Sequence, residues 1–125
     1  MARPPGYTHV VEATGPGRTV YIAGQLGLDV AGKVVGAPGD FRAQAKQAFE
    51  NLKNALAAVG AGFEDVVKIN SYLLDIPAHL PLYREVRDSY MSKEHPPAST
   101  TVQVGKLARD GALFEIEAIA VLPPG

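Results

Sequence analysis

The chain has 125 residues, of which 46% are hydrophobic and 20% charged, and its formal net charge is −1. A chain of this length buries roughly two-thirds of its unfolded surface around one core, so we expect an ordered globular protein with one domain, residues 1–125. The balanced charge does not favour a nucleic-acid partner. The absence of cysteine excludes disulfides, thiolate zinc sites and cysteine nucleophiles.

Metal-binding and membrane-spanning patterns are also missing from the sequence. His9, His79 and His95 lack the spacing of a metal site. No stretch approaches ~18 apolar residues, and the N-terminus lacks the apolar segment of a signal peptide. We therefore expect a soluble, cytoplasmic protein with no metal and no membrane partner.

The first third of the chain predicts strands. Thr8 to Ala13 and Thr19 to Leu26 contain β-branched residues and flank the turn Gly15-Pro16-Gly17, which predicts a hairpin. Lys33 to Val35 predicts a short third strand.

A long amphipathic helix is predicted next. Asp40 is a suitable N-cap, and Gly60 stands where a helix-terminating glycine belongs. Apolar side chains between them recur at helical spacing: Phe41, Ala45, Ala48, Phe49, Leu52, Leu56 and Val59.

The remaining elements complete an α+β pattern with a mixed sheet. Val66 to Asp75 predicts a strand, and about His79 to Met91 predicts a second helix with Pro81 in its first turn. Its expected inner stripe is Leu80, Tyr83, Val86 and Tyr90. Ala98 to Val104 and Leu113 to Val121 predict the last two strands. Strand-helix-strand passages imply parallel neighbours, and terminal hairpins imply antiparallel ones.

Two helices can cover only one side of a sheet of five or six strands, yet both sides of two strands look apolar. In the second strand the two sides are Val20, Ile22 and Leu26 against Tyr21 and Ala23. In the last strand we assign Leu113, Ala118 and Ala120 to one side and Phe114, Ile116, Ile119 and Val121 to the other. The helix-free side is therefore predicted to pack on other copies of the chain. Coverage by loops or the Pro-rich termini is the alternative.

Several segments, in this order, resemble the RidA/YjgF family of reactive intermediate deaminases. They are Gly6-Tyr7-Thr8-His9, Tyr21-Ile22-Ala23-Gly24-Gln25, Ala48-Phe49-Glu50-Asn51-Leu52, Pro97-Ala98-Ser99-Thr100-Thr101-Val102 and Phe114-Glu115-Ile116-Glu117-Ala118-Ile119-Ala120. The resemblance implies a chorismate-mutase-like fold with two helices on one face of the sheet, assembled as a homotrimer around a central barrel. It also implies clefts between subunits that hydrolyse small imines and enamines to a keto acid and ammonia, without a cofactor.

The resemblance also implies roles for individual residues. Glu115 matches the carboxylate that positions the attacking water, so we expect it to be catalytic. Gly24 and Thr101 match positions whose backbone groups face the ligand, and Tyr7 matches an aromatic residue near the entrance. Glu115 and Glu117 alternate with apolar neighbours, so both should point to the same side of the last strand.

Three positions depart from the family pattern. Ser99 stands where the family has a carboxylate-binding arginine, Tyr83 falls where it has an asparagine, and Ala23 where it has a serine. A serine hydroxyl donates one hydrogen bond but supplies no charge. We therefore expect a substrate other than the standard 2-imino acid, neutral or differently anchored, with Ser99 and Thr101 holding it and Tyr83 stacking on it.

Other interpretations stay open. Loss of the arginine favours a non-catalytic family member that binds a small metabolite or acts as a chaperone-like partner. Ribonuclease activity, reported for some relatives, does not fit the net charge of −1. Arg18, Arg84, Arg87, Lys106 and Arg109 are assigned to solvated surface, with replacement of the missing guanidinium from a neighbouring subunit as the alternative.

Overall fold

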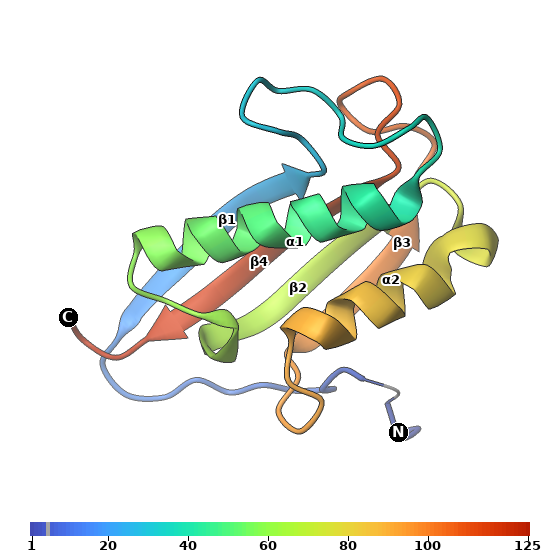
Figure 1. The fold of residues 1–125 in the computed structure, drawn as a ribbon. Coiled ribbons are helices and arrows are strands. Elements are labelled where there is room, and N and C mark those ends of the chain that lie inside the picture. Colours follow the sequence, from blue (N-terminus) through green and yellow to red (C-terminus); the bar gives the residue numbers. More distant parts are fainter. Residues whose placement is uncertain (5) are drawn as a thin grey trace.

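The computed structural model describes residues 1–4 and 6–125. In this part of the chain two α-helices pack on one face of a four-stranded sheet whose strand order is β1-β4-β2-β3 (Figure 1). The elements are β1 (Arg18–Leu26), α1 (Phe41–Ala58), the short 3-10 helix η1 (Phe63–Asp65), β2 (Val66–Leu73), α2 (Ile76–Tyr90), β3 (Ala98–Gln103) and β4 (Phe114–Leu122). The described helices include none that is long and apolar enough to cross a membrane.

The sheet is mixed, as predicted, but its connections differ from the expected ones. β2 and β3 are parallel neighbours joined by α2, whereas β4 runs antiparallel to both β1 and β2. The expected hairpin between the last two strands is wrong, because β4 lies between β1 and β2 and not beside β3. This central place gives the most apolar strand two hydrogen-bonding partners and leaves the more polar β3 at an edge.

The N-terminal segment does not form the predicted hairpin with β1. The expected strand at residues 8–13 is reduced to one bridge, Thr8 to Ala98. Thr8 N–H donates to the Pro97 carbonyl at 2.9 Å, and the Thr8 hydroxyl donates to the Pro96 carbonyl. Val10 is 72% exposed, so this segment has no buried face to stabilise a strand. The expected strand at residues 33–35 is likewise a single bridge, which joins Leu28 to Val34.

Helix α1 matches its prediction closely. The Asp40 carboxylate accepts a hydrogen bond from Ala43 N–H at 3.0 Å, and Gly60 has a φ of +76° just beyond the last turn. Six of the seven expected inward residues are buried. Val59 is 37% exposed because it is the C-cap residue, where the helix ends.

Helix α2 begins at Ile76, three residues before the predicted start. The Asp75 carboxylate accepts from Ala78 N–H at 3.1 Å and so caps the helix earlier. Pro77 therefore occupies the first turn, and Pro81 lies within the helix, not in its first turn as predicted. Pro81 has no N–H to donate, and it is tolerated on the exposed side of α2.

The core lies between the helices and the sheet and is rich in aromatic side chains. Phe49 is fully buried, and its ring centroid lies 5.2 Å from that of Tyr90 and 6.0 Å from that of Phe114. The buried Ser71 and Tyr83 hydroxyls form a hydrogen bond of 2.7 Å. The phenol thus reaches the core without leaving an unpaired polar group.

Strict alternation along β4 separates the two faces of the sheet. The side chains buried beneath the helices are Phe114, Ile116, Ala118, Ala120 and Leu122. Our assignment of Ala118 and Ala120 opposite Phe114 and Ile116 is therefore wrong, because it broke the two-residue period of a strand.

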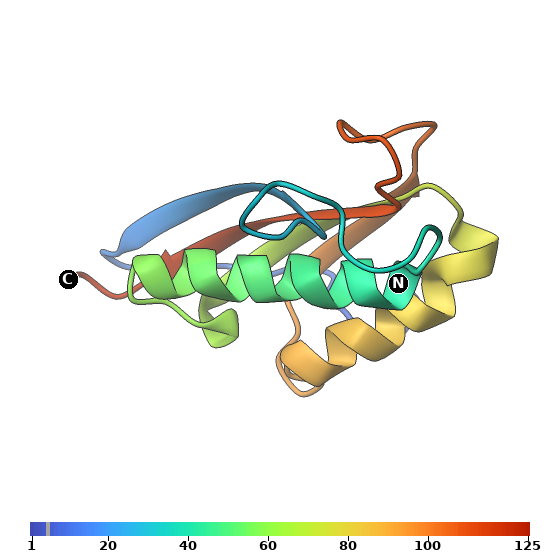
Figure 2. The same cartoon turned by 45° about the horizontal axis from the view of Figure 1, so that its top comes forward.

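The opposite face, which no helix covers (Figure 2), is only partly apolar. Ile119 and Val121 share it with Glu115 and Glu117, and Tyr21 of β1 is 76% exposed there. Packing of this face on other copies stays a prediction.

The aromatic core yields a stability prediction. Replacing Phe49 by Ala leaves a cavity among several aromatic rings and should lower the free energy of unfolding by about 3–5 kcal/mol, measured by urea denaturation. Val30 is fully exposed, so the control Val30→Ala should change it by less than about 0.5 kcal/mol. Similar effects of the two substitutions would contradict this description of the core.

Candidate functional site

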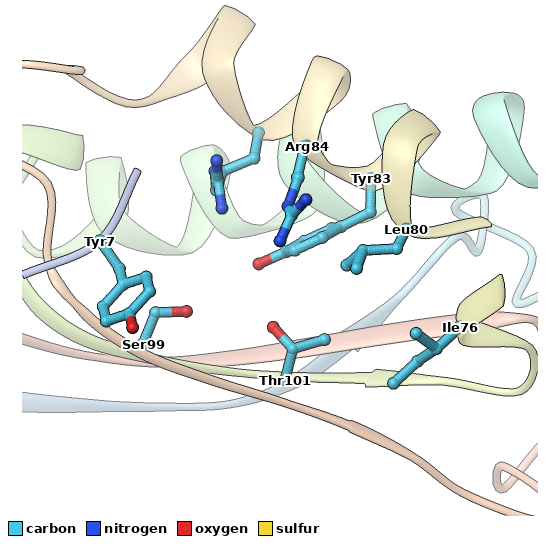
Figure 3. Close-up of a pocket in the computed structure, with 8 residues that line it drawn as sticks. Tyr7, Ile76, Leu80, Tyr83, Arg84, Ser99 and Thr101 are labelled. Carbon is cyan, nitrogen blue, oxygen red and sulfur yellow. The ribbon is translucent and has the colours of Figure 1, made fainter. Parts of the chain in front are cut away.

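A cavity of about 300 Å³ lies between β3 and α2 on the helix side of the sheet (Figure 3). It is lined by Tyr7, Ile76, Leu80, Tyr83, Arg84, Arg87, Ser99 and Thr101. Four of the six site residues predicted from the sequence are therefore brought together here. They come from the N-terminal segment and from the consecutive elements α2 and β3.

Ser99 and Thr101 reach the cavity because alternate residues of β3 share one face. β3 pairs in parallel with β2, so Ser99 lies beside Ile69 and Thr101 beside Ser71. Figure 3 shows both side chains projecting from β3 toward α2. The two hydroxyls are available to donate or accept hydrogen bonds at the cavity floor.

Tyr7 and Tyr83 form two further walls. Thr8 donates hydrogen bonds to the carbonyls of Pro96 and Pro97, just before β3 begins. These bonds hold the N-terminal segment, and Tyr7 with it, beside the cavity. Tyr83 is 1% exposed, its hydroxyl is paired with Ser71, and its ring centroid lies 5.4 Å from that of Phe114. The Tyr83 ring is thus held by the core and forms the boundary between the core and the cavity.

Two arginines of α2 line the same cavity, although both were assigned to solvated surface. For Arg87 that assignment is wrong. Its side chain is 8% exposed, and its Nη2 and Nε atoms each lie 3.1 Å from Asp88 Oδ1. Arg87 follows Tyr83 by four residues, which places both on the same side of a helix. This spacing is the sequence signal that could have identified Arg87.

Gly24 and Glu115 form a separate group on the opposite, helix-free face. Gly24 lies in a bulge of β1 between Ile22 and Gln25, next to β4. A Cβ at Gly24 would overlap Glu115 Oε2, so the carboxylate occupies the space that a side chain would take. The sequence prediction that these two residues share a site is consistent with this contact. Within one chain, Gly24 and Glu115 do not line the cavity between β3 and α2.

The environment of Glu115 raises its pKa. Burial is the larger cause, and the nearby Glu117 carboxylate adds like-charge repulsion. Glu117 is itself held in place, because it accepts hydrogen bonds from the Tyr72 hydroxyl at 2.5 Å and from Asn70 Nδ2 at 3.3 Å. The bond to Glu117 also raises the pKa of Tyr72. Sequence reasoning missed Tyr72 and Asn70 as neighbours, because they reach Glu117 from β2.

The described residues contain no cluster of three or more His, Cys, Asp or Glu side chains able to hold a metal ion. The polar groups of these two sites that could take part in chemistry are carboxylates, hydroxyls and guanidinium groups. Such groups can hold and transfer protons and can bind an anion.

Comparison with known proteins decides the family. A family model described as Endoribonuclease L-PSP matches residues 2–122. This chain belongs to the RidA/YjgF family. The resemblance seen in the sequence is thereby confirmed.

RidA-family relatives cover most of this chain. The 2-iminobutanoate/2-iminopropanoate deaminase of Bos taurus is 42% identical over 108 residues, which are 86% of this chain and 75% of the relative. A RutC family protein of Pyrococcus abyssi is 38% identical over 105 residues, 83% of this chain and 79% of that protein. The crystal structure of the Rid family protein YyfB from Yersinia pestis has a TM-score of 0.84 at 36% identity, covering 94% of this chain and 87% of that one.

The paired carboxylates give a testable pKa effect. Glu117→Gln removes the like charge, so the pKa of Glu115 should fall but stay above its ordinary value because burial persists. An NMR titration of the Glu115 side-chain carboxyl measures this shift.

The sign of the stability effect follows from the same raised pKa. The folded chain holds the Glu115 proton more tightly than the unfolded chain, which favours folding in acid. That contribution is lost as the pH rises through the raised pKa. Glu115→Gln should therefore increase stability at neutral pH more than in acid, and a pH-independent difference would contradict the assignment.

Proposed function

We propose that this RidA-family chain hydrolyses the C=N bond of a small imine or enamine in a cleft between copies of the chain. The main support for this reaction is the position of the Glu115 carboxylate, which lies against Gly24 and has a raised pKa. Relatives such as the Bos taurus 2-iminobutanoate/2-iminopropanoate deaminase, 42% identical, support the reaction class.

The reaction needs one water and one group that moves protons. An enamine first takes up a proton at carbon and loses one from nitrogen, which converts it to an imine. Water then adds to the imine carbon, forming the C–O bond, while Glu115 accepts the proton that water loses. Glu115 returns that proton to the nitrogen, which gives a carbinolamine. The hydroxyl proton of the carbinolamine then passes to the nitrogen, the C–N bond breaks as the C=O bond forms, and a carbonyl compound and ammonia leave. A carboxyl group whose pKa is shifted toward neutrality suits both steps.

The cavity and Glu115 belong to different faces of the sheet, so a complete site requires two copies. We infer a homotrimer in which the cavity of one copy meets the Glu115 and Gly24 of the next. The exposed Tyr21 and the half-buried Ile119 on the helix-free face support such packing, because water contact with large apolar side chains is unfavourable. In this arrangement Ser99 and Thr101 hold the substrate.

Substitution of Glu115 tests the reaction. With 2-iminobutanoate generated by a threonine dehydratase, Glu115→Gln should lower keto-acid release by about 100-fold or more, the usual effect of losing a general base. Glu12→Gln is the control, since Glu12 is exposed, and should leave the rate unchanged. A wild-type chain that binds the keto acid but never accelerates its release would instead support a non-catalytic metabolite binder.

The oligomeric state gives a second test. Light scattering of the wild type at micromolar concentration should give the mass of three chains. Ile119→Glu places a charge in the proposed interface and should yield single folded chains that lack activity. Val30→Glu, on a fully exposed side chain, should keep the wild-type mass. A wild-type particle of one chain would overturn the proposed cleft.

A further inference from the structure

The cavity between β3 and α2 is lined by positively charged side chains as well as by hydroxyl groups. Arg84 and Arg87 both line it, and Asp88 pairs with Arg87. These three groups together carry one net positive charge. Two hydroxyls, from Ser99 and Thr101, face the same space.

Arg87 is a fixed donor. Its guanidinium is held by Asp88, its Cζ lies 5.7 Å from the Tyr83 ring centroid, and Gly6 packs against Nη2. Asp88 engages Nε and Nη2, so within residues 1–4 and 6–125 Nη1 has no ion-pair or hydrogen-bond partner. A guanidinium has five N–H donors in a rigid plane, and those of Nη1 stay available for a ligand.

Arg84 is the exposed cation of the pair. Figure 3 shows its guanidinium extending from α2 into the cavity. The adjacent acid, Glu85, is engaged elsewhere: Arg42 donates to both of its carboxylate oxygens, at 2.9 and 3.1 Å. In the described part of the chain Arg84 therefore makes no ion pair that a ligand would have to displace.

We propose that Arg84 and Arg87 form a carboxylate-binding subsite, so that this protein acts on a small carboxylate-bearing molecule whose charge is held from α2. A planar carboxylate matches the paired N–H groups of a guanidinium. A monoanion neutralises one net positive charge, whereas a doubly charged phosphate would leave an unpaired negative charge in the cavity. The cavity volume of about 300 Å³ fits a small acid.

This arrangement accounts for Ser99. An arginine at that position would place a third guanidinium opposite two others, and like charges in a partly dehydrated cavity repel strongly. The serine supplies a hydrogen bond and avoids that repulsion. The arginines of α2 would supply the anchor whose absence at residue 99 led us to expect a substrate other than the standard 2-imino acid. The inference rests on the proposed function for the reacting C=N group, and it adds the group that anchors the other end of the substrate.

Binding of a product-like acid tests the subsite without turnover. Calorimetric titration should show that 2-oxobutanoate binds the full-length wild type more tightly than its neutral amide or inorganic phosphate. Arg84→Ala should weaken binding of the acid by about ten- to a hundredfold and leave the amide unchanged. Arg84→Lys should recover part of the affinity, because it keeps the charge but not the paired donors.

A matched control is Arg18→Ala, since Arg18 is an exposed arginine on β1, at the opposite edge of the sheet; it should bind like the wild type. Circular dichroism should show that Arg84→Ala is folded, as expected for an exposed side chain. Equal affinity of Arg84→Ala and wild type for the acid, or tighter binding of the amide or of phosphate by the wild type, would overturn the subsite.

Failure of the proposed function has a different signature. If 2-oxobutanoate binds through Arg84 but neither wild type nor Glu115→Gln releases keto acid, the subsite stands and the hydrolysis does not. If turnover depends on Glu115 while the acid binds without Arg84, the reverse holds.

Discussion

The two-residue period of β4 is the constraint on which the rest of the molecule depends. Its central place in the sheet commits every second side chain, from Phe114 to Leu122, to the space beneath the helices. The intervening positions must then face away, and these include Glu115 and Glu117. The strand that closes the core is thus the strand that presents a carboxylate with a raised pKa on the other side of the sheet. Slipping its register by one residue would bury the glutamates and expose the aromatic core.

That separation of faces explains why the chemistry is divided within one chain. The arginines of the proposed carboxylate subsite lie on α2, where Arg87 can be desolvated because Asp88 neutralises it. The Glu115 carboxylate, to which we assign proton transfer in the proposed reaction, lies on the helix-free face, where Gly24 leaves room for it. Within one chain these two sets of groups lie on different faces of the sheet, so they would meet only where two copies of the chain pack together.

Local signals predicted the parts of the fold that local interactions determine. Asp40 and Gly60 bound α1 because capping involves residues only a few positions away. The N-terminal segment was missed because its partners are remote, Thr8 and Pro96 being 88 positions apart. In the site, Ser99 and Thr101 were identified from the family resemblance, and both line the cavity. Arg87 was misplaced because burial of a guanidinium depends on Tyr83 and Asp88 packing around it, which charge alone does not reveal.

The attachment of the N-terminal segment to the entrance of β3 has a practical consequence. Tyr7 forms part of the cavity wall, and the next residue, Thr8, is hydrogen-bonded to the carbonyls of Pro96 and Pro97. A bulky affinity tag fused ahead of Met1 would compete with that seating, whereas the C-terminus follows β4, which β2 separates from β3, and lies apart from the N-terminus (Figure 1). Purification handles, fluorophores and surface immobilisation are therefore best attached after Gly125.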